Sequence, residues 1–301
     1  MNLSHPPKSK YLVANYEDEL WGMFVTSIGF QTILPDTEYP PKWHPLSHWF
    51  KPANGRVLHE HQIIYIIKGE GIFQSASCKA TKVFSGKIIL LFPEEWHTYR
   101  PVKNTGWDVY WVGFNGKIIY NLLLNNFFSV TNPVLDIGFN EQITELYKQG
   151  LEIANFQKAA YQQMLSGIVQ LLLSHIFYAE KNNSFRDKQV VSLIEKARVI
   201  MRDNINNNQT PENVAAELNM SYSWFRRIFK QYTGFSPGQY QMEIKLQKAK
   251  ELLTSTTMQV KEICFELNFE SVSYFVTFFK LKTRMSPTQY RNKIHGKKSP
   301  E

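Results

Sequence analysis

Two adjacent arginines, Arg226 and Arg227, are the residues whose type and position point most directly to a chemistry. They share the polar side of a predicted helix, 222–232, with Ser223 and Lys230. A guanidinium group can form two parallel hydrogen bonds with guanine, while lysine and serine side chains can contact phosphate oxygens. The sequence therefore indicates a helix that enters the major groove of DNA.

The segment that carries these arginines is repeated 50 residues further along the chain. When 221–240 is aligned with 271–290, 10 of the 20 positions hold the same residue. Such a repeat indicates a duplicated structural module, and two copies are too few for a solenoid, which needs at least ~3. DNA-facing residues are expected on both copies: Ser221, Ser223, Arg226, Arg227 and Lys230 on the first, and Ser271, Ser273, Tyr274, Thr277 and Lys280 on the second.

Each copy has the pattern of a helix-turn-helix. In the first copy, Thr210 is a suitable N-cap before Pro211, and a short turn at Asn219 separates two predicted helices. In the second copy, Asn268 holds the position of the turn. An alternative stays open, in which the repeat is an assembly interface. The apolar positions that predict the buried faces are Val214, Ala215, Leu218, Phe225, Ile228, Phe229, Ile263, Leu267, Phe275, Phe278 and Phe279.

The positive charge of the chain lies in its C-terminal third. The net charge is +8; residues 1–187 hold 16 Lys and Arg against 16 Asp and Glu, whereas residues 188–301 hold 18 against 10. A basic segment beside a neutral one indicates that only the C-terminal part meets a polyanion.

The composition is that of a globular protein with more than one domain. A length of 301 residues and a hydrophobic content of 43% allow two real cores and argue against intrinsic disorder. The two cysteines, Cys78 and Cys264, are far apart in the sequence, which suits a reducing compartment. No apolar stretch approaches the ~20 residues that span a bilayer, and the N-terminus lacks the apolar stretch of a signal peptide. We therefore expect a cytoplasmic protein with no membrane partner.

The hydrophobic pattern changes from strand to helix near Asn140. Residues 20–115 contain short β-branched and aromatic runs, which predict many closely spaced strands. Beyond them, apolar residues at helical spacing predict helices over about 140–154 and 156–180. The same kind of spacing predicts helices from 189 to about 294. The clearest strand runs are 62–67, 87–92 and 108–114, and turns are expected at Gly69–Gly71, Ser85–Gly86 and Lys103–Gly106.

Residues 210–291 resemble the DNA-binding domain of the AraC/XylS family of bacterial regulators. The resemblance rests on TPENVAAELNMSYSWFRRIFK, TGFSPGQY, KLQKAKELL, LNFESVSYFVTFFK and SPTQYR, and it spans nearly the whole of that domain. It implies two helix-turn-helix units joined by a long helix, here about Pro237–Leu253. The two recognition helices would enter major-groove segments roughly one turn, ~10 bp, apart.

The second unit departs from the family pattern. Arg284 and Asn268 stand where glycine is usual, and Thr277 stands where arginine or lysine is common, between Val272 and Val276. This helix therefore has little hydrogen-bonding capacity. We expect the arginines of the first unit to read bases, and the second unit to dock through shape, methyl contacts and phosphates.

The N-terminal half is similar to the effector-binding cupin barrel of the same family, in the subgroup that senses sugars. The similar stretches are GRVLHEHQIIYIIKGEGIF, SGKIILLFPEEWHTYRP and GWDVYWVGFNG. The resemblance implies a small molecule inside the barrel and a dimer contact made by the helices that follow. Together with strand alternation, it points to Arg56 and Tyr99 as hydrogen-bonding contacts and to Trp111 as a stacking contact. Each could instead be structural, Trp111 in the core and Arg56 paired with a carboxylate.

Histidines in this half raise the question of a metal site. His59 and His61 would share one face of a strand, and His97 follows later, as in the metal-binding cupins. The spacing does not match that arrangement, so no metal is expected. Counted back from the strand-turn pattern, the ligand positions would fall on Arg56, Leu58 and Gln62.

The predicted fold class is an α+β multidomain protein, with a cupin-like β-barrel, a following helical pair and an all-α domain that carries two helix-turn-helix motifs. The predicted parts are the barrel over 1–139, a helical dimerisation region over 140–180, a linker over 181–188 and the DNA-binding domain over 189–295. The apolar stripe of 161–172 is the candidate dimer surface, although it could equally pack back on the barrel.

The expected function is sequence-specific transcription regulation, as an activator that responds to a sugar or related small molecule. The expected partners are double-stranded promoter DNA, a carbohydrate-like effector, RNA polymerase and a second copy of the chain; no enzymatic activity and no cofactor are expected. A repressor, or a regulator with a non-sugar effector, remains an alternative, and a metal-dependent cupin enzyme a remote one.

Overall fold

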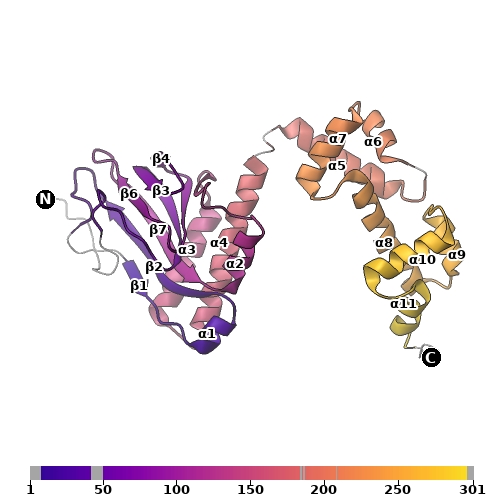
Figure 1. Ribbon diagram of the computed structural model, residues 1–301, viewed down its shortest axis with the longest axis horizontal. Coiled ribbons are helices and arrows are strands. Elements are labelled where there is room, and N and C mark those ends of the chain that lie inside the picture. Colours follow the sequence, from indigo (N-terminus) through magenta and orange to yellow (C-terminus); the bar gives the residue numbers. More distant parts are fainter. Residues whose placement is uncertain (1–7, 42–49, 184, 186, 208, 297–301) are drawn as a thin grey trace. The chain divides into compact units, whose positions relative to one another are not determined.

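The chain divides into two compact units, Met1–Ser184 and Phe185–Glu301. The computed structural model describes residues 8–41, 50–183, 185, 187–207 and 209–296. The strands belong to the first unit, and the described part of the second is helical (Figure 1). Of the predicted linker, residues 184 and 186 lie outside the described part. Helix α4 (Tyr161–Asn183) already covers its first three residues, and α5 (Lys188–Asp203) begins at its last.

The first unit is built on antiparallel strands in the order β1-β2-β7-β3-β5-β8, with β4 and β6 also paired to β3. The strand bounds are β1 (Lys8–Tyr11), β2 (Phe24–Ile33), β3 (His61–Ser75), β4 (Thr81–Phe84), β5 (Lys87–Leu91), β6 (His97–Pro101), β7 (Trp107–Asn115) and β8 (Val134–Asp136). Strand β3 belongs to two ladders: it pairs with β7 and β5 in its first part, and with β4 and β6 from Glu70 onward.

The continuous apolar run of β3 is explained by burial on both faces. Successive side chains of a strand point in opposite directions. Ile63 and Tyr65 contribute to a first core that also contains the helices, whereas Ile64 and Ile66 contribute to a second core with Phe73 of the other ladder. A strand buried on both sides must be apolar at every position rather than at every second one.

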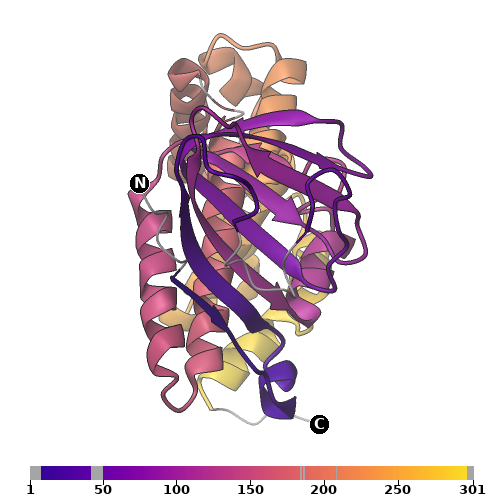
Figure 2. The same cartoon turned by 90° about the vertical axis from the view of Figure 1, so that its left-hand side faces the viewer.

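Two long helices, α3 (Glu141–Phe156) and α4, lie side by side against the sheet (Figure 2). Helix α3 begins where the Asn140 side chain accepts a hydrogen bond from the Ile143 amide at 3.2 Å. The hydroxyl of Tyr147, a fully buried residue of α3, donates to the Ile63 carbonyl oxygen at 3.0 Å. Two shorter helices, α1 (Tyr16–Leu20) and α2 (Lys117–Leu124), complete the unit. The two helices predicted after Asn140 are confirmed, with ends that differ by a few residues.

The apolar stripe predicted over 161–172 divides between two environments. Leu165, Ile168 and Leu172 are buried in the first core of their own unit. Met164 and Leu171 are 60% and 51% exposed, so only these positions remain free for contact with another molecule.

The turn predicted at Gly69–Gly71 is wrong, because β3 runs through it. Gly69 has φ +83 and lies where the strand passes from one ladder to the other; a Cβ there would come within 2.1 Å of the Gly106 carbonyl oxygen. The glycine therefore serves a bend and a close approach of backbones rather than a chain reversal. The turns predicted at Ser85–Gly86 and Lys103–Gly106 are present.

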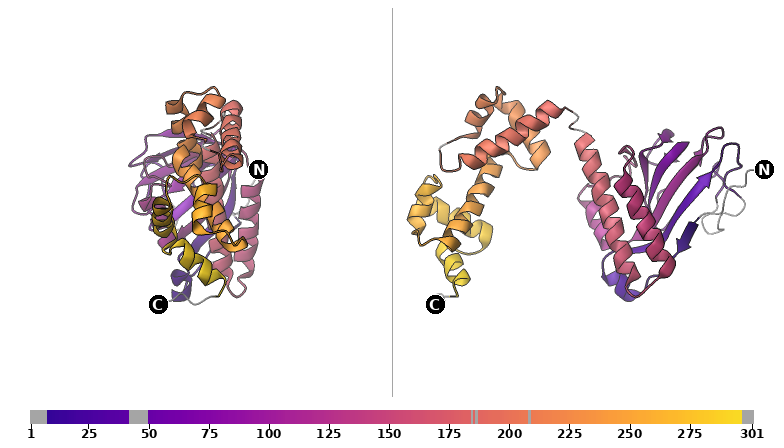
Figure 3. Two further views of the ribbon diagram at one scale, coloured as in Figure 1. Left: turned by 90° about the vertical axis from the view of Figure 1, so that its right-hand side faces the viewer. Right: turned by 180° about the vertical axis from the view of Figure 1, so that it is seen from behind.

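The second unit consists of two helical clusters that share one long helix, α8 (Pro237–Ser255) (Figure 3). Phe225 and Phe229 lie at the centre of the first cluster, and Phe275 and Phe279 hold the equivalent places in the second. The helices of the first cluster are α5, α6 (Pro211–Glu217) and α7 (Tyr222–Thr233). Those of the second are α9 (Val260–Glu266), α10 (Val272–Thr283) and α11 (Pro287–Ile294).

The sequence repeat is also a structural repeat. The rings of Phe229 and Tyr240 meet edge to face with centroids 5.3 Å apart, and those of Phe279 and Tyr290 do so at 5.4 Å. Helices α8 and α11 begin with the same Ser-Pro pair and the same capping box, closed by a glutamine three residues later. The predicted fold class is confirmed: a sheet-rich N-terminal unit with a helical pair precedes two helix-turn-helix units.

Candidate functional site

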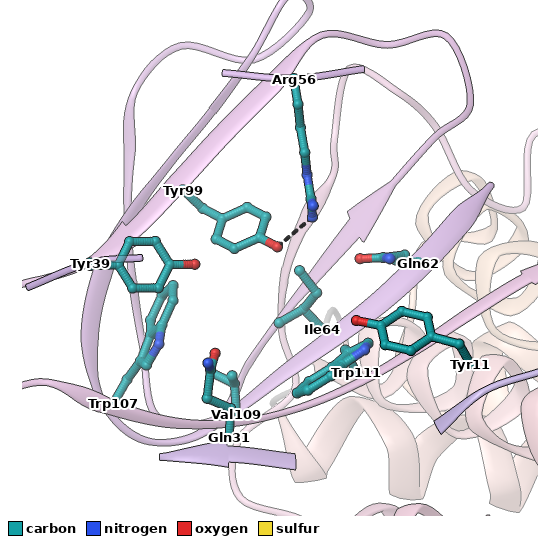
Figure 4. A pocket seen from close by; sticks show the side chains of 10 residues that line it. All are labelled: Tyr11, Gln31, Tyr39, Arg56, Gln62, Ile64, Tyr99, Trp107, Val109 and Trp111. Carbon is teal, nitrogen blue, oxygen red and sulfur yellow. Dashed lines mark hydrogen bonds between the residues drawn. The ribbon is translucent and has the colours of Figure 1, made fainter. Parts of the chain in front are cut away.

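A pocket opens on the side of the sheet that carries the second core, and we call it the inner pocket (Figure 4). Its empty space is about 450 Å³, counted with the part open to solvent. The structure brings the three predicted contact residues, Arg56, Tyr99 and Trp111, together in this pocket. The complete lining is Tyr11, Gln31, Tyr39, Arg56, Gln62, Ile64, Tyr99, Trp107, Val109 and Trp111.

Arg56 is held by aromatic and imidazole neighbours. Its Nη2 donates to the Tyr99 hydroxyl at 2.7 Å, and its Nε donates to His97 Nε2 at 3.3 Å. The guanidinium carbon also lies 4.6 Å from the ring centroid of Phe50, a cation–π distance. A planar cation held on several sides keeps a fixed orientation in the lining of the pocket.

The contacts of His97 define its protonation state. Its Nδ1 lies 3.0 Å from the carbonyl oxygen of Glu95, which can only accept, so Nδ1 carries the hydrogen and Nε2 is the acceptor for Arg56. Burial, reinforced by the Arg56 charge, lowers the pKa of His97 to about 4. The imidazole is therefore neutral at physiological pH and supports the arginine without repelling it.

The two tryptophans of the pocket rest on glycines. A Cβ on Gly29 would lie 2.1 Å from Trp111 Cζ2, and a Cβ on Gly71 would lie 2.4 Å from Trp107 Cζ3. Only glycine permits an indole ring to lie this close to the strand. The rings are thereby fixed as flat apolar surfaces.

Polar groups with no partner complete the pocket. Gln31 is 5% exposed, and its Nε2 has no hydrogen-bond partner among the described residues. The same holds for Nε1 of Trp107. Gln62 donates from Nε2 to Glu60 Oε1 at 2.6 Å, which leaves its carbonyl oxygen as the group that can face a ligand. These buried donors can pair with the acceptor atoms of a water molecule or of a ligand.

Several lining residues were not predicted. Trp107 and Val109 alternate with Trp111 along β7, so the period of two that selected Trp111 would also have found them. Gln31 on β2 and Tyr39 in the loop after it carried no comparable signal. Their place in the pocket follows from the pairing of β2 with β7.

The three histidines considered for a metal have separate surroundings. His59 is exposed, with Nδ1 2.6 Å from Glu94 Oε1. His61 is buried beside Asn115, with Nδ1 3.2 Å from its Oδ1, while His97 lies under Arg56. Over the described ranges, no group of three or more His, Cys, Asp or Glu side chains could hold a metal ion.

Helix α7 presents a cationic face opposite its buried one. Arg226, Arg227 and Lys230 are exposed, as is Ser223, while Phe225, Ile228 and Phe229 are buried on the other side. Ser221 is the N-cap residue, although its side chain makes no capping hydrogen bond and remains exposed.

The corresponding face of α10 is almost neutral. Ser271 caps the helix by accepting a hydrogen bond from the Tyr274 amide at 3.1 Å, which leaves its O–H group able to donate. The predicted residues Ser273, Tyr274, Thr277 and Lys280 are exposed, and Val272 and Val276 are half-buried beside them. The only cation among these side chains is Lys280, near the end of the helix.

Two family models match the chain. A family described as an AraC-like ligand binding domain matches residues 27–179, and a helix-turn-helix domain matches residues 214–293. The chain belongs to the AraC family. It is a DNA-binding transcriptional regulator with a ligand-binding domain. Nine of the ten residues that line the inner pocket, all but Tyr11, lie within the range that the ligand-binding family matches. The relatives that align with three quarters or more of this AraC-family chain are transcriptional regulators by name.

Three relatives illustrate the AraC-family likeness over most of the chain. The lactose operon transcription activator of Staphylococcus xylosus is 26% identical over 244 residues, 79% of this chain and 86% of that protein. The raffinose operon transcriptional regulatory protein RafR of Pediococcus pentosaceus is 24% identical over 244 residues, 79% of this chain and 87% of that protein. The MmsAB operon regulatory protein of Pseudomonas aeruginosa is 24% identical over 264 residues, 83% of this chain and 82% of that protein. No helix in the described residues is long and apolar enough to cross a membrane.

Proposed function

We propose that this regulator activates transcription in response to a sugar or closely related small molecule bound in the inner pocket. The observation that carries the proposal is the combination in one pocket of fixed indole faces with unsatisfied polar groups. A pyranose ring has an apolar C–H face that can lie on an indole, and hydroxyl groups around its edge that both donate and accept. Trp111 supplies the face, the Gln31 amide supplies an unsatisfied donor for an edge hydroxyl, and the Arg56 guanidinium lies in the same lining.

The names of two relatives support this choice of ligand class. One is a regulator of a lactose operon and another of a raffinose operon, and both align with most of this chain. The MmsAB regulator carries no sugar in its name, so the relatives alone do not select a sugar. The residues of the pocket support the choice of a polyhydroxylated ligand.

The DNA partner would be promoter DNA, in which the two recognition helices of one chain enter major-groove segments about one helical turn apart. The exposed arginines of α7 can bond guanine directly, whereas α10 offers methyl groups of Val276 and Thr277 for thymine contacts and Lys280 for phosphate. The first unit therefore carries most of the base recognition, and the second contributes shape and backbone contacts.

The remaining partners would be a second copy of the chain and RNA polymerase, in the cytoplasm. Met164, Leu171 and Tyr178 lie seven residues apart on α4, and all three are exposed. A seven-residue spacing places these side chains along one side of the helix, as in helix pairs. We assign this side of α4 to the homodimer. A dimer would let an effector in the sheet unit change how two DNA-binding units meet their half-sites.

The test begins with thermal unfolding of the full-length chain against a panel of sugars and sugar acids. A ligand at 100 times its dissociation constant stabilises a protein by ~2.7 kcal/mol, which shifts the midpoint measurably. A Trp111→Ala variant should lose the shift. DNase footprinting with and without the active sugar then tests whether the ligand changes promoter occupancy. If no sugar stabilises the chain while footprinting still shows specific occupancy of the promoter, the proposal of a sugar effector is wrong. The assignment as a DNA-binding regulator is then unaffected.

A further inference from the structure

The loop between α5 and α6 crosses from one helical cluster of the second unit to the other. Of this loop, residues 204–207 and 209 are described. Met201, the last buried residue of α5, belongs to the first cluster, whereas Ile205 is buried in the core of the second. The chain then returns to the first cluster with Val214 of α6. The two clusters are therefore connected by this loop as well as by the shared helix α8.

Asn206 ties the loop to the turn of the second helix-turn-helix. Its side-chain Nδ2 donates a hydrogen bond to Glu266 Oε1 at 2.6 Å, and its main-chain oxygen accepts one from Nδ2 of Asn268. Asn268 is the turn residue in the left-handed region, with φ +49. Glycine adopts this conformation more readily but has no side-chain amide to donate. The asparagine side chain is thus the group that reaches the loop of the first cluster.

Helix α8 is bonded to both of these partners. Nε2 of Gln241 donates to the main-chain oxygen of Gln209, at the far end of the loop, at 2.6 Å. One turn further along α8, Nζ of Lys245 donates to the main-chain oxygen of Asn268 at 2.9 Å. Side chains four residues apart lie on the same face of a helix. The loop and the second turn therefore meet along one face of α8, and the hydrogen bonds of Asn206 join them to each other.

This arrangement restrains the two recognition helices. Helix α7 packs in the first cluster and α10 in the second. If α8 were the only connection, a bend in that one helix would reorient α10 relative to α7. The loop opposes such a change, because bending α8 would separate Asn206 from Asn268 and Glu266.

We propose that Asn206 and Asn268 are positioning residues for DNA recognition, which hold α10 at a fixed orientation to α7. The chain thereby selects DNA by the separation of the two major-groove segments as well as by their bases. This rests on the proposed contact of both recognition helices with DNA. A fixed orientation raises the effective concentration of the second contact at one separation and lowers it at others. Because α10 carries few hydrogen-bonding groups, its contribution depends on this geometry.

The first experiment measures affinity against the separation of the two segments. The full-length chain selects a duplex from a random-sequence library, and footprinting locates the segments that it protects. Duplexes with one or two base pairs inserted between the segments are then compared with the selected duplex in competition gel shifts. Each inserted base pair turns the second segment by ~34° about the DNA axis. The wild-type chain should bind the altered duplexes about tenfold more weakly.

The double variant Asn206→Ala/Asn268→Gly removes both hydrogen bonds and keeps the backbone of the turn. It should lower the ratio of affinities for the selected and altered duplexes about fivefold, because the altered separation no longer requires a hydrogen bond of ordinary net strength to be broken. The base preference in the segment bound by α7 should not change. The matched control is Asn207→Ala/Asn219→Gly. Asn207 donates within the loop, to Asn204 Oδ1 at 2.9 Å, and Asn219 is the turn residue of the first unit, with φ +56.

The second experiment measures the geometry without DNA. Spin labels are placed at Gln231→Cys and Leu281→Cys, two exposed and equivalent positions near the ends of α7 and α10. Cys78 is replaced by serine, and Cys264 is fully buried and stays unlabelled. Electron–electron double resonance then gives the distribution of distances between the two labels. The double variant should show a broader distribution than the wild-type and control chains.

The proposal requires both changes, a lower affinity ratio and a broader distance distribution, and it is overturned if either quantity stays at its wild-type value. A lower unfolding midpoint by itself would mean that the two asparagines only stabilise the fold. Equal effects of the control variant would overturn the proposal as well, because neither of its asparagines joins the two clusters.

Footprinting separates this proposal from the one on which it rests. If two segments are protected but wild-type affinity does not depend on their separation, the positioning role is wrong and the contact of both helices with DNA is unaffected. If only one segment is protected, both proposals are wrong.

Discussion

The ammonium group of Lys245 donates a hydrogen bond to the main-chain carbonyl oxygen of Asn268 at 2.9 Å. Lys245 lies in the long helix α8 and is only 9% exposed, and Asn268 occupies the turn of the second helix-turn-helix in the left-handed region, with φ +49. Burial lowers the pKa of Lys245, but its nitrogen also lies 5.3 Å from the ring centroid of Phe269, a favourable cation–π contact. The joining helix and the second turn are thus held together by one buried charge.

Replacing Lys245 with methionine should destabilise the second unit by ~1–2 kcal/mol. The aliphatic stem is kept, but the charged hydrogen bond and the cation–π contact are lost. Urea unfolding followed by circular dichroism measures the change. Lys248→Met, on the same helix and paired with Glu251 at the surface, is the control and should change stability by less than ~0.5 kcal/mol. Equal effects of the two substitutions would remove the special role of Lys245.

Arg284→Gly should stabilise the chain by ~0.5–1 kcal/mol. Arg284 has φ +65 at the end of α10, where the first repeat has Gly234 with φ +81. The left-handed conformation costs a residue with a side chain ~1–2 kcal/mol. Glycine avoids this cost, but part of the gain is lost because glycine loses more conformational entropy on folding. The thermal midpoint should rise. A fall would mean that the Arg284 side chain makes a stabilising contact in solution that outweighs the backbone strain.

Gly29→Ala should displace Trp111 and destabilise the sheet unit by ~1–3 kcal/mol, because the new methyl group would overlap the indole ring. Any sugar that stabilises the wild-type chain should bind at least tenfold more weakly to this variant. Gly167→Ala in α4 is the contrasting substitution, since nothing lies within 4 Å of a Cβ at that position. It should leave binding intact and stabilise the helix by ~0.5–1 kcal/mol.

The buried histidines make the sheet unit less stable in acid. His97 has a pKa of about 4 in the folded chain, below its ordinary value of ~6.5, so the unfolded chain binds the proton more readily between these values. The stabilising contribution is therefore complete above pH ~6.5 and is lost as the pH falls toward 4, by up to about 3 kcal/mol. Burial also lowers the pKa of His61, which acts in the same direction.

The free energy of unfolding, measured by urea titration between pH 7.5 and 4, tests this account. His97→Gln should make the free energy of unfolding depend less steeply on pH. The part of the dependence that is due to His61 should remain. His59→Gln, at an exposed position, is the matched control. An unchanged pH dependence in His97→Gln would contradict the assignment of a buried neutral imidazole.

Single substitutions on α7 and α10 should affect DNA binding unequally. Arg226→Ala and Arg227→Ala should each cost ~1–3 kcal/mol at the specific site and reduce its preference over random DNA. Lys230→Ala should weaken binding to all DNA sequences alike. It should also lower the salt dependence of the affinity by the equivalent of about one phosphate contact. Thr277→Ala should have the smallest effect. Competition gel shifts with specific and random DNA measure these ratios, and an unaltered ratio in both arginine variants would refute base reading by α7.

The second unit was largely predictable because its signals are local. The buried phenylalanines, the Thr210 cap and the long helix from Pro237 all depend on residues within one or two turns of each other. Duplication of the pattern also made each copy a check on the other. The exposed positions of α7 and α10 followed directly from helical periodicity.

The pocket was predictable only in part, because it depends on strand pairing. Arg56, Tyr99 and Trp111 were found, yet Gln31 and Tyr39 come from a strand and a loop that the sequence alone does not bring beside them. The misplaced turn at Gly69–Gly71 has the same origin. A glycine that lets one strand serve two ladders has the same local sequence as a glycine that reverses the chain.

The packing of Trp111 on Gly29 and of Trp107 on Gly71 has a consequence for the fluorescence of the chain. Of the seven tryptophans, only Trp224 belongs to the second unit, and Trp107 and Trp111 form walls of the pocket. Their emission wavelength and its quenching depend on the polarity of the space that a ligand would fill. The chain therefore contains its own fluorescent reporter for effector binding, which can be read while DNA is bound and without any attached dye.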